Sequence, residues 1–138
     1  MEQLTVPGTL ESLEIIREYV KTAAAIAGFD RKATYRLVVA VDEVASNIVT
    51  YGYAEVGLAG MVNVWAEINE PVLTIYMEDT GEAYDPSPRP ADDFDLLLEE
   101  RELGGLGLFL ANRNVDEFRY KRFGDRNRHT FVVYRNTG

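Results

Sequence analysis

The amino-acid sequence predicts an α+β fold, a two-layer sandwich with helices on one face of an antiparallel or mixed sheet. Three observations lead to this prediction. Residues 10–51 hold two stretches whose apolar residues recur at the helical spacing of three and four. Residues 61–78 and 115–135 each hold two alternating apolar and polar runs, which are typical of antiparallel hairpins. Helical and strand segments in this order favour layers of helix on sheet.

Length and composition indicate one globular domain, which we expect to span residues 1–138. No apolar run approaches the ~20 residues that span a bilayer, and no basic-then-apolar signal opens the chain. The chain has no cysteine, which excludes disulfides and thiolate metal sites. We therefore expect a cytoplasmic protein that does not bind a membrane.

The formal net charge is −9, and it is unevenly distributed along the chain. Residues 1–100 are strongly acidic, whereas residues 101–138 carry more basic than acidic side chains. An acidic chain without a basic stripe across its body argues against nucleic acid as a direct ligand. The basic C-terminal portion could face a phosphate or an acidic partner, or its charges could simply lie on a solvated strand face.

The first elements are a short strand and a helix. Residues 3–7 have a strand pattern that ends at a proline. Thr9 and Ser12 are alternative N-caps for the helix that follows, and Gly28 suits its C-terminal end.

The second helix is expected to run from Arg31 to about Tyr51, with Asp30 as its N-cap. Glu43 and Asn47 are four residues apart, so they share a face at the border of the apolar stripe. A carboxylate and a carboxamide one turn apart suit Mg²⁺ beside substrate phosphates. An ordinary amphipathic helix with a solvated polar edge is the alternative interpretation.

The segments Met61–Asn69 and Val72–Glu78 alternate around a short turn and predict a hairpin. Asp79 and Gly81 follow directly in a D-x-G pattern. A carboxylate at a strand end can accept a hydrogen bond from an exocyclic amine such as that of adenine, and the glycine permits close backbone approach. A plain turn is the alternative, because aspartate and glycine are turn residues.

Residues 80–103 lose regularity, and their prolines and clustered carboxylates indicate a functional lid or a linker. The stretch Gly104–Gly107 then precedes a predicted helix, Leu108–Asn114. Glycines at a helix N-terminus let backbone N–H groups converge on a phosphate, although a flexible hinge has the same composition. The last predicted elements are two strands around a turn: Val115–Arg122, Gly124–Asn127 and Arg128–Arg135.

The three motifs together, E-x-x-x-N on a helix, D-x-G at a strand end and G-G-x-G after a lid, resemble those of the GHKL ATPase superfamily. This superfamily includes gyrase-type topoisomerases, histidine kinases and MutL-type repair proteins. The segments DEVASNIVTYGY, MEDTGEAYDP and GGLGLFLANRNVDEF are most similar to the bacterial anti-sigma factor serine/threonine kinases, the RsbW and SpoIIAB group. The resemblance covers essentially the whole chain and implies the GHKL (Bergerat) ATPase fold, with ATP and Mg²⁺ as cofactors.

The resemblance also implies roles for two residues of the second helix. Glu43 would be the catalytic general base, which takes the proton of the attacking serine hydroxyl or of water. Asn47 would be the metal ligand that holds Mg²⁺ at the ATP phosphates. Arg101 is a candidate for the cation near the γ-phosphate, with an exposed lid arginine as the alternative.

The remaining matched residues would bind the nucleotide. Asp79, helped by Gly81, would bind the adenine amino group. Thr130 matches a threonine that helps to bind adenine through water, although a plain strand threonine is an equally simple interpretation. The last group would hold the phosphates through backbone N–H groups: Gly105, Leu106 and Gly107.

Two features depart from the pattern. Ala83 stands where the second glycine of D-x-G-x-G is usual, so the adenine loop is less open. The only histidine is His129, on a late strand, and we expect it to be an ordinary strand residue. A histidine kinase needs a phospho-accepting histidine on an upstream helix, which this sequence does not show.

The resemblance implies an ATP-binding anti-sigma regulatory factor with serine/threonine protein kinase activity. Its substrate would be a STAS-type anti-sigma antagonist in a partner-switching pathway, and a sigma factor is a further candidate partner. The alternative is a non-catalytic nucleotide-binding module that acts by protein contact only; Glu43 favours the kinase, because a binder needs no base. A stand-alone ATPase is weaker, because no transducer domain is evident. The resemblance, together with the open edge of the strand at residues 3–7, makes a homodimer plausible.

Overall fold

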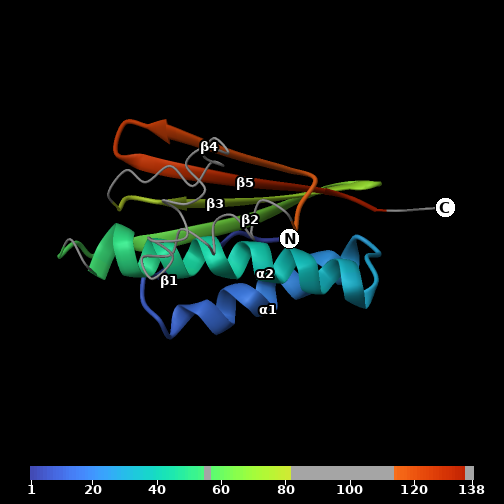
Figure 1. The fold of residues 1–138 in the computed structure, drawn as a ribbon, viewed down its shortest axis with the longest axis horizontal. Coiled ribbons are helices and arrows are strands. Elements are labelled where there is room, and N and C mark those ends of the chain that lie inside the picture. Colours follow the sequence, from blue (N-terminus) through green and yellow to red (C-terminus); the bar gives the residue numbers. More distant parts are fainter. Residues whose placement is uncertain (55–56, 82–113, 136–138) are drawn as a thin grey trace, which may run out of the picture.

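A computed structural model of the protein describes residues 1–54, 57–81 and 114–135. In this part of the chain, helices α1 (Ser12–Ile26) and α2 (Arg31–Asn47) pack on one face of a five-stranded sheet (Figure 1). The predicted α+β sandwich is confirmed. None of the described helices is long and apolar enough to cross a bilayer.

Several predicted features lie outside the described residues. They are the lid of residues 82–103 with Ala83 and Arg101, the Gly104–Gly107 stretch, and the helix from Leu108 up to residue 113.

All neighbouring strands of the described sheet are antiparallel, in the order β1-β2-β3-β5-β4. The two predicted hairpins are β2–β3 and β4–β5, and they meet where β3 pairs with β5. The strands are β1 (Leu4–Pro7), β2 (Met61–Asn69), β3 (Val72–Asp79), β4 (Glu117–Phe123) and β5 (Arg126–Tyr134). This topology places the end of β3 beside the start of β5.

The core lies between the sheet and the two helices. Alternate strand residues point toward the helices, and these are the buried ones: Val62, Val64, Leu73, Ile75, Met77 and Phe131. They meet the predicted apolar stripes of α1 and α2, which include Ile16, Val20, Leu37, Val41 and Val44. Each large aliphatic side chain that is fully buried here contributes about 1.5–3 kcal/mol to stability.

The start of α1 differs from the sequence prediction. Its N-cap is Glu11, whose side chain makes no capping hydrogen bond, so the choice of Thr9 or Ser12 was wrong. The chain arrives from β1 through a tight turn, in which the N–H of Ser12 donates to the carbonyl of Thr9 at 3.1 Å. Ser12 is therefore already helical and buried.

The end of α1 confirms the predicted glycine. Gly28 has a φ of +84°, in the left-handed region that favours glycine. Its N–H donates to the carbonyl of Ala25 at 3.1 Å, and the N–H of Phe29 donates to that of Ala24 at 3.0 Å. These two hydrogen bonds form a Schellman motif, which ends the helix and reverses the chain toward α2.

Helix α2 begins at its predicted cap and ends at Asn47, but helical winding continues beyond the predicted end in a further segment. The Oδ1 of Asp30 accepts the N–H of Ala33 at 2.8 Å. After Asn47 the chain winds into a wider π-helical segment, η1 (Ile48–Ala54), instead of ending near Tyr51.

The β4–β5 turn is tighter than predicted. It contains only Gly124 and Asp125, because Phe123 and Arg126 already pair. Gly124 has a φ of +60°, which suits such a two-residue turn. Strand β5 therefore starts two residues earlier than expected.

We predict that Asp30→Ala lowers the free energy of unfolding by about 1 kcal/mol, because α2 loses the acceptor for an unpaired backbone N–H. Urea denaturation followed by circular dichroism measures the change. Asp30→Asn is the matched control, since its amide oxygen still caps the helix and it should retain most of the stability. Equal losses in the two variants would contradict a capping role.

Candidate functional site

Asp79 ends strand β3 and is only 2% exposed. Its Oδ1 accepts two hydrogen bonds, from the N–H of Gly81 at 2.8 Å and from Nδ2 of Asn127 at 2.9 Å. Its Oδ2 is buried and has no hydrogen-bond partner. Buried polar atoms are rarely left in this state unless a water, an ion or a ligand satisfies them. The carboxylate is thus fixed through one oxygen and presents the other.

Asn127 holds this corner together. It lies opposite Asp79 in the β3–β5 ladder, and its Nδ2 also donates to the carbonyl of Gly81 at 3.1 Å. Its Oδ1 accepts from the hydroxyl of Tyr120 at 2.6 Å and from Nη1 of Arg122 at 3.0 Å. Arg122 Nη1 donates to the carbonyl of Gly81 at 3.1 Å as well. The D-x-G segment is therefore held by β4 and β5 from the side.

The sequence interpretation assigned residue 127 to a turn and missed this role. The signal that finds it is the strand register, because β5 already begins at Arg126 and its pairing with β3 places Asn127 opposite Asp79.

His129 lies beside the same carboxylate. It is 2% exposed, and its Nε2 is 3.5 Å from Oδ2 of Asp79. Its ring lies against those of Tyr120 and Phe118, with centroid distances of 5.3 and 6.3 Å. The structure therefore places His129 at the site, although its sequence context suggested an ordinary strand residue.

Thr130, the predicted adenine-binding threonine, lies on the other face of the sheet. Successive strand residues point to opposite faces, so the direction of His129 toward Asp79 turns Thr130 away. Thr130 instead lines a hollow with Tyr76 and Arg119. The structure does not bring Thr130 and Asp79 together.

Segment η1 is hydrogen-bonded to the end of the sheet that carries Asp79. The hydroxyl of Tyr53 accepts the N–H of Thr80 at 2.9 Å and donates to the carbonyl of Met61 at 2.9 Å. A Cβ on Gly81 would lie 2.7 Å from the carbonyl oxygen of Gly52, so this close approach requires glycine. Figure 1 shows the end of α2 with η1, the end of β3 and the β4–β5 hairpin at one end of the molecule.

Asn47 belongs to this end of the molecule, because it precedes Gly52 by about one and a half helical turns. Its side chain is buried, and its Nδ2 has no hydrogen-bond partner. Rotation of the carboxamide exchanges nitrogen and oxygen, so the group can equally present a carbonyl oxygen.

Glu43 lies one turn before Asn47 on the same face of α2. The pKa of its half-buried carboxyl is raised, first by desolvation and then by repulsion from neighbouring Asp42. A carboxylate whose pKa is raised toward neutrality binds a proton more readily, which suits a general base.

Asn47 is the candidate metal ligand at this end of the molecule. No cluster of three or more histidine, cysteine or acidic residues suited to a metal occurs in the described part of the chain. Mg²⁺ beside phosphates needs only one or two protein ligands, because phosphate and water oxygens supply the rest. The unsatisfied carboxamide of Asn47 fits such a site. Gly105, Leu106 and Gly107, the predicted phosphate ligands, lie outside the described residues.

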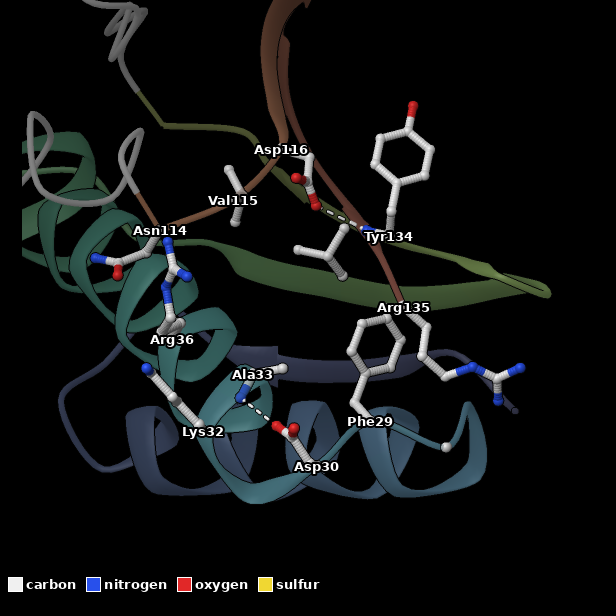
Figure 2. A pocket seen from close by; sticks show the side chains of 12 residues that line it. Phe29, Asp30, Lys32, Ala33, Arg36, Asn114, Val115, Asp116, Tyr134 and Arg135 are labelled. Carbon is white, nitrogen blue, oxygen red and sulfur yellow. Dashed lines mark hydrogen bonds between the residues drawn. The ribbon is translucent and has the colours of Figure 1, made fainter. Parts of the chain in front are cut away.

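A pocket of about 420 Å³ lies at the opposite end of α2. Figure 2 shows Lys32 and Arg36 projecting from α2, with Asp116 across from them. The two carboxylates of this pocket are used by the backbone: Asp30 accepts from Ala33 and Asp116 accepts the N–H of Tyr134 at 2.7 Å. The Asp79 end is therefore the better candidate, since among the described residues it is there that a buried carboxylate oxygen accepts no hydrogen bond.

The fold defines a class of protein: an α+β sandwich domain in which two helices cover one face of an antiparallel sheet. The family profile described as "Histidine kinase-like ATPase domain" matches residues 6–133. The chain belongs to this family.

Curated relatives agree with this assignment. The chain is 29% identical over 127 residues to the serine-protein kinase RsbW of several Staphylococcus aureus strains, among them MRSA252 and Newman. These matches cover 88% of this chain and 80% of the relatives.

Two solved structures share the fold. The structure of the RsbU and RsbW domains of Rv1364c from Mycobacterium tuberculosis matches with a TM-score of 0.63 and 18% identity, over 97% of this chain and 32% of that one. The Acinetobacter baumannii histidine kinase AdeS matches with a TM-score of 0.50 and 14% identity, over 99% of this chain and 69% of that one. At these identities the likeness concerns the fold alone.

We predict that Asn127→Asp destabilises the fold by about 1–3 kcal/mol at neutral pH, because it replaces a donor to Asp79 and Gly81 with a second carboxylate. Two adjacent carboxylates raise each other's pKa in the folded state, so the deficit should shrink as the pH falls toward 4. Urea denaturation of parent and variant between pH 4 and 8 measures it. A deficit that does not change with pH would contradict direct contact between the two side chains.

Proposed function

We propose that this chain is an ATP-binding anti-sigma regulatory factor with serine/threonine protein kinase activity. Family membership and the likeness to the serine-protein kinase RsbW support the proposal. The observation that carries it is the carboxylate of Asp79, which is held through Oδ1 and presents a buried Oδ2 that accepts no hydrogen bond from the described residues, with Nε2 of His129 at 3.5 Å.

This carboxylate suits adenine. Oδ2 is a hydrogen-bond acceptor, and adenine offers an exocyclic amine as donor. Guanine offers a carbonyl oxygen at the corresponding ring position, which would face the carboxylate as a second acceptor. The arrangement therefore favours ATP over GTP, and the donors that hold Oδ1, from Gly81 and Asn127, keep the carboxylate oriented.

The phosphates and the metal would be held by other parts of the chain. Asn47 would bind Mg²⁺ through its carboxamide oxygen, and the ion when bound neutralises phosphate charge. The backbone N–H groups of Gly105, Leu106 and Gly107 would hold the phosphates, as predicted from their position before a helix.

Glu43 would act as the general base that accepts the hydroxyl proton of the substrate serine or threonine. Its raised pKa supports this role, because proton transfer is most efficient when the pKa of the base is near the working pH. A module that only binds nucleotide would have no use for a desolvated carboxylate at this position, so Glu43 favours the kinase over the non-catalytic alternative.

The protein partners rest on the likeness to RsbW. The substrate would be a STAS-domain anti-sigma antagonist in a cytoplasmic partner-switching pathway, and a sigma factor would be the second partner. A homodimer is also proposed, because β1 forms one edge of the described sheet and sheet edges tend to pair or be covered.

We predict that Asp79→Asn weakens ATP binding at least about a hundredfold, because an amide nitrogen would then face the adenine amine as a second donor. Isothermal titration calorimetry at millimolar Mg²⁺ measures the change. Asp116→Asn is the matched control, since that carboxylate serves a backbone N–H at the other end of the sheet, and it should bind ATP like the parent. A parent protein that binds no ATP under these conditions would refute the proposed function.

We predict that Glu43→Gln retains ATP affinity but transfers phosphate about 10²–10⁴ times more slowly, because the amide cannot accept a proton. The readout is phosphate transfer from labelled ATP to a STAS-domain protein of the same organism. A carboxyl whose pKa is raised by folding stabilises the fold below its unfolded pKa and loses that contribution as the pH rises. The variant should therefore be no less stable than the parent at neutral pH.

Asp42→Asn is the control for charge in the Glu43 experiment. It keeps the base but removes one cause of the raised pKa of Glu43, so the acid limb of the transfer rate should move to lower pH. Equal transfer rates for Glu43→Gln and the parent would show that Glu43 is only a polar helix residue.

A further inference from the structure

The outer face of the sheet, opposite α1 and α2, carries a cluster of aromatic and cationic side chains. Within the described residues no helix packs on this face (Figure 1). The cluster forms where β2, β3, β4 and β5 approach the β4–β5 turn. We define the outer-face patch as Trp65, Tyr76, Lys121, Phe123, Arg126 and Arg128.

The patch is built around Arg128. The rings of Trp65 and Tyr76 stack with a centroid distance of 5.1 Å and an interplanar angle of 17°. The guanidinium carbon of Arg128 lies 5.5 Å from the centroid of Trp65, 5.9 Å from that of Tyr76 and 4.9 Å from that of Phe123. These cation–π contacts keep the side chains in one arrangement, so a partner would meet a preformed surface.

The patch carries surplus positive charge. Glu78 is buried and pairs with Arg128, and its other oxygen lies 3.7 Å from Arg126. The third cation is Lys121, whose Nζ lies over the ring of Phe123, 4.8 Å from its centroid. The patch therefore contains three cations and the single carboxylate of Glu78. Arg119 at the margin forms its own pair with Glu117 at 3.0 Å. A local surplus of this kind contrasts with the net charge of −9 for the whole chain.

The patch also contains a hollow of about 550 Å³, lined by Tyr76, Phe123, Arg128 and Thr130 among others. Its size lies within the range of pockets that bury a ligand group. Phe123 is 38% exposed there. The hollow therefore has room for one large apolar side chain between aromatic and cationic walls.

We propose that the outer-face patch docks an acidic segment of a partner protein. An apolar or aromatic side chain of that segment fills the hollow, and its flanking carboxylates pair with Lys121 and Arg126. Tryptophan, tyrosine and arginine are the residue types that dominate binding energy at protein interfaces. The acidic surface elsewhere on the chain is screened from such a contact, because the Debye length is about 8 Å at physiological salt.

Two other occupants fit less well. Nucleic-acid bases need free aromatic faces, whereas Trp65 and Tyr76 stack on each other and lie under Arg128. A long polyanion would also meet the repulsion of an acidic protein. A second copy docked patch to patch would bring like charges together.

This surface is separate from the proposed nucleotide site. Glu78 belongs to the outer face, whereas Asp79, the next residue of β3, points toward the helix side. The docking proposal therefore goes beyond the proposed function, and a failure of one leaves the other intact.

Trp65 is the only tryptophan of the chain, so its fluorescence reports directly on the patch. The probe is a seven-residue peptide with a central leucine flanked by three glutamates on each side. Matched peptides carry glutamine or lysine in place of glutamate, and a dT12 oligonucleotide serves as the nucleic-acid probe. We expect the acidic peptide to shift the Trp65 emission and to bind at least about tenfold more tightly than the glutamine peptide at physiological salt, where the acidic surface elsewhere is screened.

The variant is Lys121→Glu with Arg126→Glu, because both side chains are exposed and leave the Arg128–Glu78 pair in place. It should lose the preference for the acidic peptide. Lys21→Glu with Arg31→Glu, at exposed helix positions, changes the net charge equally and should keep it.

Calorimetric titration with MgATP, which tests the nucleotide site, runs in parallel on all proteins. Three results would overturn the docking proposal: equal binding of the acidic and glutamine peptides, tighter binding of dT12 than of the acidic peptide, or an acidic preference that survives in the Lys121→Glu, Arg126→Glu protein. Analytical ultracentrifugation tests self-association. A parent protein that is dimeric, together with a Lys121→Glu, Arg126→Glu variant that is monomeric, would assign the patch to self-association instead.

Discussion

The pairing of β3 with β5 is the constraint on which the rest of the structure depends. It joins the two hairpins into one sheet, with Leu73 opposite Val133 and Asp79 opposite Asn127. The side chains of a strand alternate with a period of two, so a slip of one residue would exchange the two faces of β5. Such a slip would remove Phe131 from the core and His129 from Asp79. The buried apolar side chains therefore fix the register, and the register in turn assembles the candidate site.

Tyr53 joins the helical layer to this sheet. Tyr53 is fully buried and bridges two strands, through the N–H of Thr80 and the carbonyl of Met61. Its position depends on the wider winding of η1 after Asn47. The close approach of Gly52 and Gly81 completes the contact. Through these contacts the C-terminal end of α2 and the D-x-G turn after β3 are held at the same end of the molecule.

The sequence was sufficient for the fold class, because its periods of three to four and of two mark helices and strands independently of tertiary contacts. The cap at Asp30 and the helix end at Gly28 followed from local rules and are confirmed. The predicted N-cap of α1 was wrong because a tight turn between Thr9 and Ser12 precedes the helix. The predicted length of the β4–β5 turn was wrong because it depends on how those two strands pair.

The candidate site was predictable only in part, for the same reason. Asp79 was found from its motif, but Asn127 and His129 reach it through the register of another strand. That register separates His129 from Thr130, and no feature of a single strand's sequence determines which of two adjacent residues faces the helices. Resemblance to a family fixes the order of motifs, whereas a one-residue choice on β5 requires the sheet itself.

The same alternation gives adjacent residues opposite tasks. On β3, Glu78 neutralises cations on the outer face, while Asp79 presents a carboxylate on the helix side. On β5, Arg128 organises the aromatic rings of the outer face, and His129 is buried against Asp79. Both faces therefore depend on one ladder of backbone hydrogen bonds. A ligand at the Asp79 end and a partner on the outer face would contact side chains of the same two strands, on opposite sides of a single layer.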